Sequence, residues 1–168
     1  MTLPRITIRR AHLNDLDALT ALSMRSKQSN GYDDAFMQAC RDELAVTQDS
    51  LRGGEYWVAE GDAICGLACI ACDPLGNTAE ITAFFIEPDR KRQGIGTLLW
   101  RKLLERAADL SIRTLRLDAD PAAVPFYTSL GFRVVGEAPS GSIAGRTLPH
   151  MTLTLEGTGT HAQGTLPG

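Results

Sequence analysis

The chain has 168 residues, of which 43% are hydrophobic and 22% charged, and its formal net charge is −3. A chain of this length folds most simply as one domain around one core, and the mildly acidic balance argues against a general nucleic-acid binder. No apolar run approaches the roughly 20 residues that cross a bilayer, and the first residues lack the apolar segment of a signal peptide. We therefore expect a cytoplasmic protein.

The first half of the chain predicts helices and strands in alternation. Apolar residues at helical spacing mark the helices, and alternation of polar and apolar residues marks the strands. The predicted elements are a strand over residues 5–9, a helix after Asn14, a helix over 33–44, and strands over 55–60 and 63–72. Asp17 follows Asn14 by three residues, as in a capping box, and the hairpin turn between the last two strands is predicted at Gly61-Asp62.

The second half continues this alternation. The predicted elements are a strand over 79–87, a helix over 98–110, a strand over 114–118, a short helix after Asp120, and strands over 132–137 and 151–155. Asp120 reads as a helix N-cap and Gly131 as a helix C-cap. The fold class expected is α/β, with a central mixed and mostly antiparallel sheet of six or seven strands and helices on both faces. We expect one domain over residues 1–155 and a flexible, Gly- and Thr-rich tail over 156–168.

Three of the four cysteines have the spacing C-x3-C-x2-C, which radical enzymes use to hold an iron–sulfur cluster. These residues, Cys65, Cys69 and Cys72, lie in an apolar run that predicts a buried strand. On a regular strand the first two share a face and the third points to the other, so the three thiols do not converge. We expect thiols packed as small hydrophobic groups and no metal, with the iron–sulfur cluster as the weaker alternative.

A glycine-rich segment that opens the helix after the strand over 79–87 carries the strongest functional signal. Two glycines one residue apart, Gly94 and Gly96, follow three consecutive cationic side chains, Arg90, Lys91 and Arg92. Glycine permits positive φ, and a helix N-terminus receives anions, so the segment predicts phosphate binding. The P-loop pattern G-x-x-x-x-G-K-[ST] is absent, and a dinucleotide-binding fingerprint would require a third glycine.

The run K-R-Q-G-I-G resembles the acyl-coenzyme A signature of the GCN5-related N-acetyltransferases (GNAT), [QR]-x-x-G-x-[GA]. A second segment, from Phe126 to Phe132, is similar to the family's F-Y-x-x-x-G-F. The resemblance implies the GNAT fold and acetyl-CoA as co-substrate. The residues it places along acetyl-CoA are Phe84, Phe85, Ile86, Lys91, Arg92, Gln93, Gly94, Ile95, Gly96 and Thr97. Lys91 departs from the usual Gln or Arg, and Asp120 replaces the family's frequent Asn, so we expect Asp120 to cap a helix and not to bind the cofactor.

The same resemblance implies transfer of an acetyl group to a primary amine of a small molecule or peptide, by direct attack in a ternary complex. It places Glu80 as general base and Tyr127 as general acid that protonates the departing thiolate. An alkylamine with a pKa of about 10.4 is only about one part in two thousand neutral at pH 7, so a base is required. The alternative bases are Asp118, Glu87, His150 and water.

The acceptor is left open by the sequence. Loops set specificity in such proteins, and the candidates are residues 29–33 and 139–146, with Tyr32 and Arg146 as the expected substrate-binding side chains. The expected partners are acetyl-CoA and an amine, without nucleic acid or membrane, and a homodimer is left open. The alternative function is a non-catalytic acyl-CoA sensor or partner-binding domain of the same fold.

Overall fold

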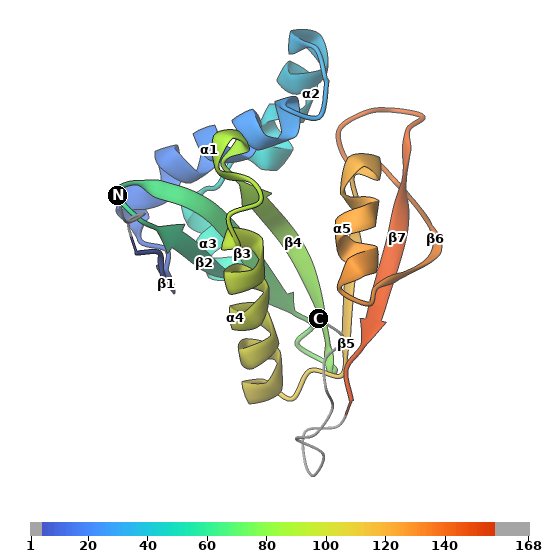
Figure 1. Cartoon of the computed structure of the whole chain (residues 1–168). Coiled ribbons are helices and arrows are strands. Elements are labelled where there is room, and N and C mark those ends of the chain that lie inside the picture. Colours follow the sequence, from blue (N-terminus) through green and yellow to red (C-terminus); the bar gives the residue numbers. More distant parts are fainter. Residues whose placement is uncertain (1–4, 157–168) are drawn as a thin grey trace.

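The computed structural model describes residues 5–156, in which seven strands form one sheet (Figure 1). The strand order is β1-β2-β3-β4-β5-β7-β6, and every neighbouring pair is antiparallel except β4 and β5. The strands are β1 (Thr7–Arg10), β2 (Glu55–Glu60), β3 (Ile64–Cys72), β4 (Thr78–Ile86), β5 (Thr114–Asp118), β6 (Arg133–Pro139) and β7 (Thr147–Thr154). The predicted mixed, mostly antiparallel sheet is confirmed.

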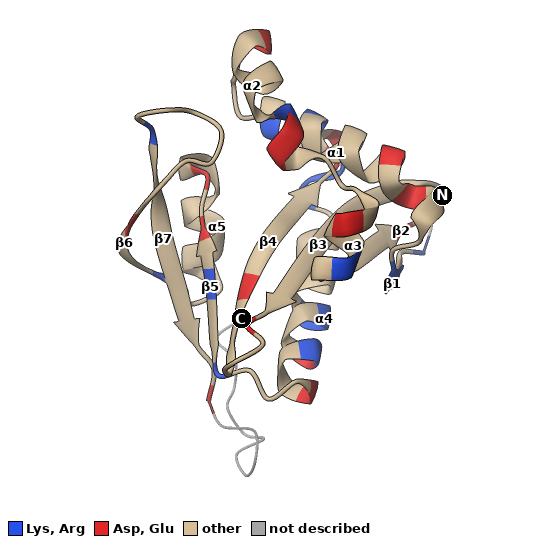
Figure 2. Cartoon of the chain, turned by 180° about the vertical axis from the view of Figure 1, so that it is seen from behind, with Lys and Arg blue, Asp and Glu red and all other residues tan. Residues whose placement is uncertain are grey.

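Helices cover both faces of this sheet. They are α1 (Leu16–Gln28), α2 (Asp34–Leu44), α3 (Gln48–Gly53), α4 (Ile95–Asp109) and α5 (Val124–Ser129). Helix α4 packs against β2 and β3 on one face, and α1 packs against β3 and β4 on the other (Figure 1). Charged residues lie mainly on the helices and at the ends of elements, as Figure 2 shows from behind.

Two hydrophobic clusters hold the layers together. The larger contains Leu99 and Leu103 of α4 with Phe132 and Met151, all at most 1% exposed. The smaller contains Leu19 and Leu22 of α1, with Val58 and Leu67. Complete burial of one such side chain stabilises a fold by roughly 1.5 to 3 kcal/mol. The sheet is therefore fixed on both faces, and β3 contributes to both clusters.

The parallel pair β4 and β5 is joined over only three residues of each strand. Thr78 to Glu80 pair with Thr114 to Arg116, and no further pairing of the two strands follows within residues 5–156. Beyond Glu80 the strands diverge (Figure 1), while β3 remains paired with β4 as far as Ile86. The far half of β4 thus has one free backbone edge, and it faces the divide between the two halves of the sheet.

Three local features differ from the sequence-based expectations. The capping box before α1 is formed by His12 and Asp15 and not by Asn14 and Asp17. His12 is the N-cap of a short 3-10 turn (Leu13–Asp15), and the carboxylate of Asp15 accepts from the backbone N–H of His12 at 2.7 Å. Helix α3 was not predicted, although Thr47 and Ser50 form its capping box. Strand β7 begins at Thr147, four residues before the predicted start.

The cysteine-rich strand is buried as expected at Cys65 and Cys69, whereas Cys72 at its end is exposed, so the expected packing of this third thiol is wrong. A register shift between Ala59 and Glu60 interrupts the pairing of this strand with β2. The thiol of Cys65 donates to the carbonyl of Ala59 at 3.4 Å, and burial raises its pKa. Burial also raises the pKa of Cys69, to about 11. Among residues 5–156, no group of three His, Cys, Asp or Glu side chains is placed to hold a metal ion.

Apart from Glu156, the predicted tail over 156–168 lies outside the described residues. Within the described part of the chain, no helix is both long enough and apolar enough to cross a membrane.

Candidate functional site

The glycine-rich segment forms a backbone cradle between β4 and α4. Arg92 and Gly94 both adopt left-handed conformations, with φ of 65° and 83°, and Gly94 is the N-cap of α4. Alternation of left-handed and right-handed residues turns successive N–H groups to one side, which makes an anion-binding concavity. No side chain of the described residues caps α4, so the N–H groups of its first turn are available to a ligand.

The space around this cradle fits a phosphate-bearing chain. A Cβ atom added at Gly94 would meet nothing within 4 Å, and one at Gly96 would make ordinary contacts with Phe126 at 3.6 Å and Phe84 at 3.8 Å. The two glycines therefore leave open volume over the helix N-terminus and beside two aromatic rings. Arg90 and Lys91 border the same volume and provide positive charge.

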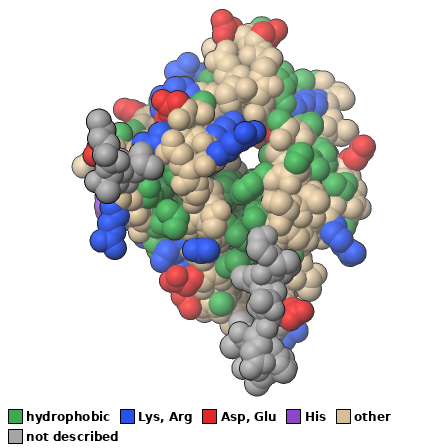
Figure 3. All heavy atoms as spheres, in the orientation of Figure 1, with side chains coloured by type: hydrophobic (Ala, Val, Ile, Leu, Met, Phe, Trp, Pro, Cys, Tyr) green, Lys and Arg blue, Asp and Glu red, His purple; other side chains and the backbone are tan. Residues whose placement is uncertain are grey.

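A cavity of about 520 Å³ extends from the cradle into the divide between β4 and β5. The molecule is hollowed near its centre in Figure 3, with Lys and Arg at the edge of the hollow and hydrophobic side chains along its sides. All ten residues expected to contact acetyl-CoA, except Gln93, line this cavity. Gln93 instead accepts a hydrogen bond from Arg90 at 2.8 Å. The structure therefore gathers nine of the ten residues around one space.

Tyr127 lies in the wall of the same cavity, and only 7% of the residue is exposed. Its ring packs between Phe84, Phe126 and Phe132, with ring centroids 5.3 to 6.2 Å apart. Its hydroxyl makes no hydrogen bond to another side chain or backbone group of residues 5–156 and is not enclosed by them. Burial raises the pKa of Tyr127, which keeps the phenol protonated and able to donate.

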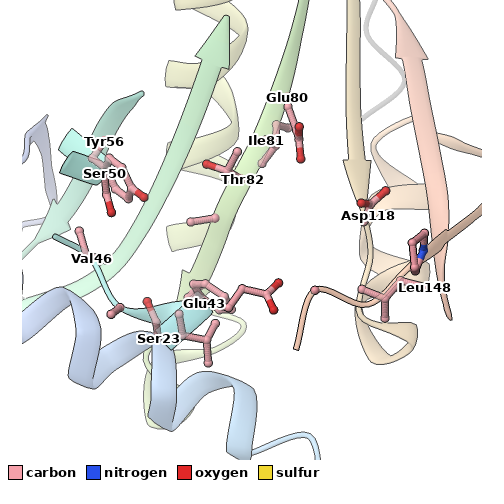
Figure 4. A pocket seen from close by; sticks show the side chains of 16 residues that line it. Ser23, Glu43, Val46, Ser50, Tyr56, Glu80, Ile81, Thr82, Asp118 and Leu148 are labelled. Carbon is pink, nitrogen blue, oxygen red and sulfur yellow. The ribbon is translucent and has the colours of Figure 1, made fainter. Parts of the chain in front are cut away.

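A second cavity, of about 300 Å³, shares several wall residues with the first, among them Thr82 and Asp118. Figure 4 shows Glu80 and Thr82 on β4 on one side of this cavity and Asp118 at the end of β5 on the other. Glu43, near the end of α2, directs its carboxylate into the gap between them. The two cavities adjoin along the divide, and we call the two together the passage. Arg90, Lys91 and Arg92 line only the larger cavity and Glu80 only the smaller, whereas Glu43 and Asp118 line both.

The two carboxylates nearest the strand divide differ in their partners. Glu80 has a loose ion pair with Arg116, 3.7 Å between Oε1 and Nη2, and both side chains are more than one-third exposed. Asp118 Oδ1 lies only 2.6 Å from Nδ1 of His150, which stands opposite it in the β5–β7 register. Glu80 is therefore the less engaged acceptor for a proton. Glu87, another of the alternative bases, has its pKa lowered by a hydrogen bond from Arg25.

Tyr32 and Arg146 are brought together although 113 residues separate them. Arg146 Nη2 donates to the Tyr32 hydroxyl at 2.6 Å, and that hydroxyl donates to Asp120 Oδ2 at 2.8 Å. Lys27 completes the group with an ion pair to Asp120 at 3.1 Å. This interaction, the Tyr32–Asp120–Arg146 bridge, links the α1–α2 loop to the β6–β7 loop. Neither Tyr32 nor Arg146 lines the two cavities described above.

Asp120 caps the following turn as expected, because its carboxylate accepts from the backbone N–H of Ala122 at 2.9 Å.

The sequence did not predict Glu43, Tyr56 and Leu148 as site residues, and they line the smaller cavity, at the acceptor end of the passage. Their spacing gave no signal: they lie on α2, β2 and β7, and only the packing of these elements brings them together.

Residues 22–155 match the family model described as "Acetyltransferase (GNAT) domain". The chain is 29% identical over 153 residues to a peptidyl-lysine N-acetyltransferase, YjaB, of Salmonella typhimurium, which covers 88% of this chain and 97% of that protein. It is 30% identical over 112 residues to human N-acetyltransferase 8, covering 61% of this chain. The matched part spans about half, 49%, of that human relative.

The fold is shared with the PaiA N-acetyltransferase of Thermoplasma acidophilum, which was solved in complex with coenzyme A. The two chains are 19% identical, and the superposition covers 90% of this chain and 99% of the other with a TM-score of 0.72.

Proposed function

The chain belongs to the GNAT acetyltransferase family, and we propose that it acetylates a primary amine, with acetyl-CoA as donor, by direct attack in a ternary complex. The observation that carries this proposal is that the two cavities adjoin and share wall residues. The anion cradle at α4 and Tyr127 line the larger cavity, and three carboxylates line the smaller one. One end is suited to a phosphate-bearing donor and the other to a cationic acceptor. We also propose that residues 1–155 act as one catalytic domain.

The donor would lie along the larger cavity. The N–H groups at the start of α4, together with Lys91 and Arg92, would hold its pyrophosphate. Phe84, Phe85 and Ile86 would follow the acyl arm, since β4 has no strand partner on that side. Acetyl-CoA, when bound, supplies an acetyl group on a thioester whose sulfur is a good leaving group. A coenzyme A complex of the PaiA relative supports this assignment.

Glu80 would remove the proton that the acceptor nitrogen loses as the new C–N bond forms. Tyr127 would give its proton to the sulfur as the C–S bond breaks, so that the products are an amide and a neutral thiol. A free backbone N–H of β4 would stabilise the negative charge that develops on the carbonyl oxygen. Tyr32 and Arg146 would act on the acceptor indirectly, by holding the β6–β7 loop beside the cavity.

Thiol release from acetyl-CoA in the presence of a panel of amines tests the proposal. We expect amine-dependent release, and Tyr127→Phe should lower kcat by about 10²-fold while the dissociation constant for coenzyme A stays nearly unchanged. The substitution removes only the hydroxyl, so packing against the three phenylalanines is retained. Unaltered kcat would remove Tyr127 from the mechanism. Coenzyme A binding without thiol release from any amine would favour the acyl-CoA sensor instead.

A further inference from the structure

The acceptor end of the passage is lined by acidic and neutral side chains only. Its 16 lining residues include the carboxylates of Glu43, Glu80 and Asp118, and they include no lysine, arginine or histidine. Arg116 and His150 reach Glu80 and Asp118 from outside this wall. Positive charge is thus kept out of the space in which the acceptor would lie. A cavity with walls of one sign concentrates ligands of the opposite sign.

Glu43 is the carboxylate whose position needs a separate explanation. It stands on α2, away from the strands that carry the other two, and Figure 4 shows its carboxylate directed into the gap between β4 and β5. Its only side-chain partner in residues 5–156 is the hydroxyl of Ser142 in the β6–β7 loop. The adjacent Gly141 permits this approach, because a Cβ atom there would lie 3.2 Å from a Glu43 oxygen. In the described part of the chain, no basic side chain forms an ion pair with Glu43.

Two further observations point to a small ligand in this space. Tyr127, which is only 7% exposed, lines the adjoining larger cavity, and its hydroxyl has no hydrogen-bond partner among residues 5–156. The Tyr32–Asp120–Arg146 bridge and the Ser142–Glu43 contact both tie the β6–β7 loop across the divide. The volume of about 300 Å³ is that of roughly ten water molecules, enough for a chain of a few carbon atoms with a charged group at each end.

We infer that the acceptor is a small aliphatic amine with a second cationic group, and that Glu43 binds this second group while Glu80 faces the amine that reacts. This inference rests on the proposed function and specifies its substrate class. Arg146 is not placed to bind a carboxylate of this acceptor, because it lines neither cavity, its Nη2 donates to the Tyr32 hydroxyl, and its guanidinium lies over the Phe36 ring at 4.9 Å. An amine that carries a carboxylate would meet three like charges and no compensating cation.

Three amines of equal chain length test the inference: 1,4-diaminobutane, butylamine and 4-aminobutanoate. We expect the diamine to exceed butylamine in kcat/KM by roughly tenfold or more, the worth of one hydrogen bond to a charged group, and 4-aminobutanoate to be the poorest. Glu43→Gln should bring the ratio of diamine to butylamine close to one. Asp42→Asn is the matched control, because it removes the same charge one residue away outside the cavity lining, and it should keep the ratio.

Equal kcat/KM for the diamine and butylamine would overturn the inference, as would faster acetylation of a lysine-containing peptide than of any small amine. An unchanged ratio of kcat/KM for the diamine to that for butylamine in Glu43→Gln would also overturn the inference. Glu43 would then have only the structural role of holding the β6–β7 loop through Ser142.

Calorimetric titration of the amines into the coenzyme A-bound protein separates this inference from the proposed function. Tighter binding of 1,4-diaminobutane than of butylamine, lost in Glu43→Gln, supports the inference even if no amine is acetylated, which would contradict only the proposed function. Equal binding of the two amines would overturn the inference whatever the turnover.

Discussion

Glu80 and Asp118 are the two carboxylates that compete for the role of general base. Asp118 is held by His150 at 2.6 Å, whereas the nearest cation to Glu80 is 3.7 Å away, so Glu80 is freer to accept a proton. A carboxylate at either place lies close to the diverging edges of β4 and β5. The choice between them is therefore a matter of proton acceptance and is decided by the pH dependence of turnover.

Replacement of Glu80 by Gln should lower kcat/KM at pH 7 by about 10² to 10³-fold. Without a base, the rate depends on the fraction of acceptor that is already neutral, so it should rise about tenfold per pH unit toward the amine pKa of about 10.4. The measurement is kcat/KM from pH 6.5 to 9.5. Asp118→Asn is the matched control, and a loss below about tenfold with a wild-type profile is expected. The reverse pattern would assign the base to Asp118.

The elements around the site show which parts of it can be read from the sequence. The cradle and Tyr127 follow from contiguous motifs, because backbone conformation at a helix start depends on local residues such as Gly94. Glu43 could not be found in this way, because a glutamate near the end of a helix is usually a solvated charge. Its place in the site depends on how α2 packs in three dimensions.

The contrast between local sequence and tertiary packing also explains where the observed secondary structure differs from the predicted one. The capping box forms at His12 and Asp15, two residues before the predicted pair Asn14 and Asp17, because the carboxylate of Asp15 also accepts two hydrogen bonds from Arg9, at 2.8 and 3.1 Å. That long side chain comes from β1, so local cap preference is overridden by tertiary structure. Strand β7 extends past its apolar core because β6 pairs with it as far as Thr147, a contact that alternation of polar and apolar residues in one segment does not reveal.

The role of the turn before α4 in coenzyme A binding can be tested by substitution of its glycine, Gly94. Gly94 and Gly145 have nearly equal positive φ, 83° and 80°, and at both a Cβ atom would meet nothing within 4 Å. Alanine at either position should lower the free energy of unfolding by about 1 to 2 kcal/mol, the cost of a left-handed conformation for a residue with a Cβ atom. Gly94→Ala should also weaken coenzyme A binding by roughly tenfold, whereas Gly145→Ala should not.

Urea denaturation measures the first effect and calorimetric titration of coenzyme A the second. Similar coenzyme A affinity in the two variants would contradict the assignment of Gly94 to the anion cradle. A smaller stability loss in both would mean that the turns relax at little cost.

On the scale of the whole molecule, cationic side chains line one of the two cavities and not the other. The protein carries a net charge of −3, yet Arg90, Lys91 and Arg92 line the larger cavity. The smaller cavity is lined by three carboxylates and no cationic side chain, and two of these carboxylates, Glu43 and Asp118, line both cavities. The sheet makes this arrangement possible, because β4 and β5 pair over only three residues each before they diverge. The two halves must be held in place by other contacts, among them the Tyr32–Asp120–Arg146 bridge.

Ion pairs between elements within the half of the molecule that contains β1 to β4 make stability depend on pH. Hydrogen bonds from Arg9 lower the pKa of Asp15 and of Glu60, and one from Arg106 lowers the pKa of Glu55. A carboxyl group whose pKa is lower in the folded than in the unfolded chain stabilises the fold above its unfolded pKa, about 4. This stabilisation is lost as the pH falls through the folded-state value.

We therefore expect the free energy of unfolding to be nearly flat between pH 5 and 8 and to fall below pH 4. Asp15→Asn should cost about 1 to 2 kcal/mol at pH 7, since the Asp15 side chain is only 11% exposed and is bonded to Arg9. The difference from wild type should shrink as the pH is lowered, because protonation then removes the same charge from wild type. Urea denaturation at pH 7, 5, 4 and 3 measures it, with the exposed Asp17→Asn as control. A difference independent of pH would mean that packing of Asp15, and not its charge, provides the stability.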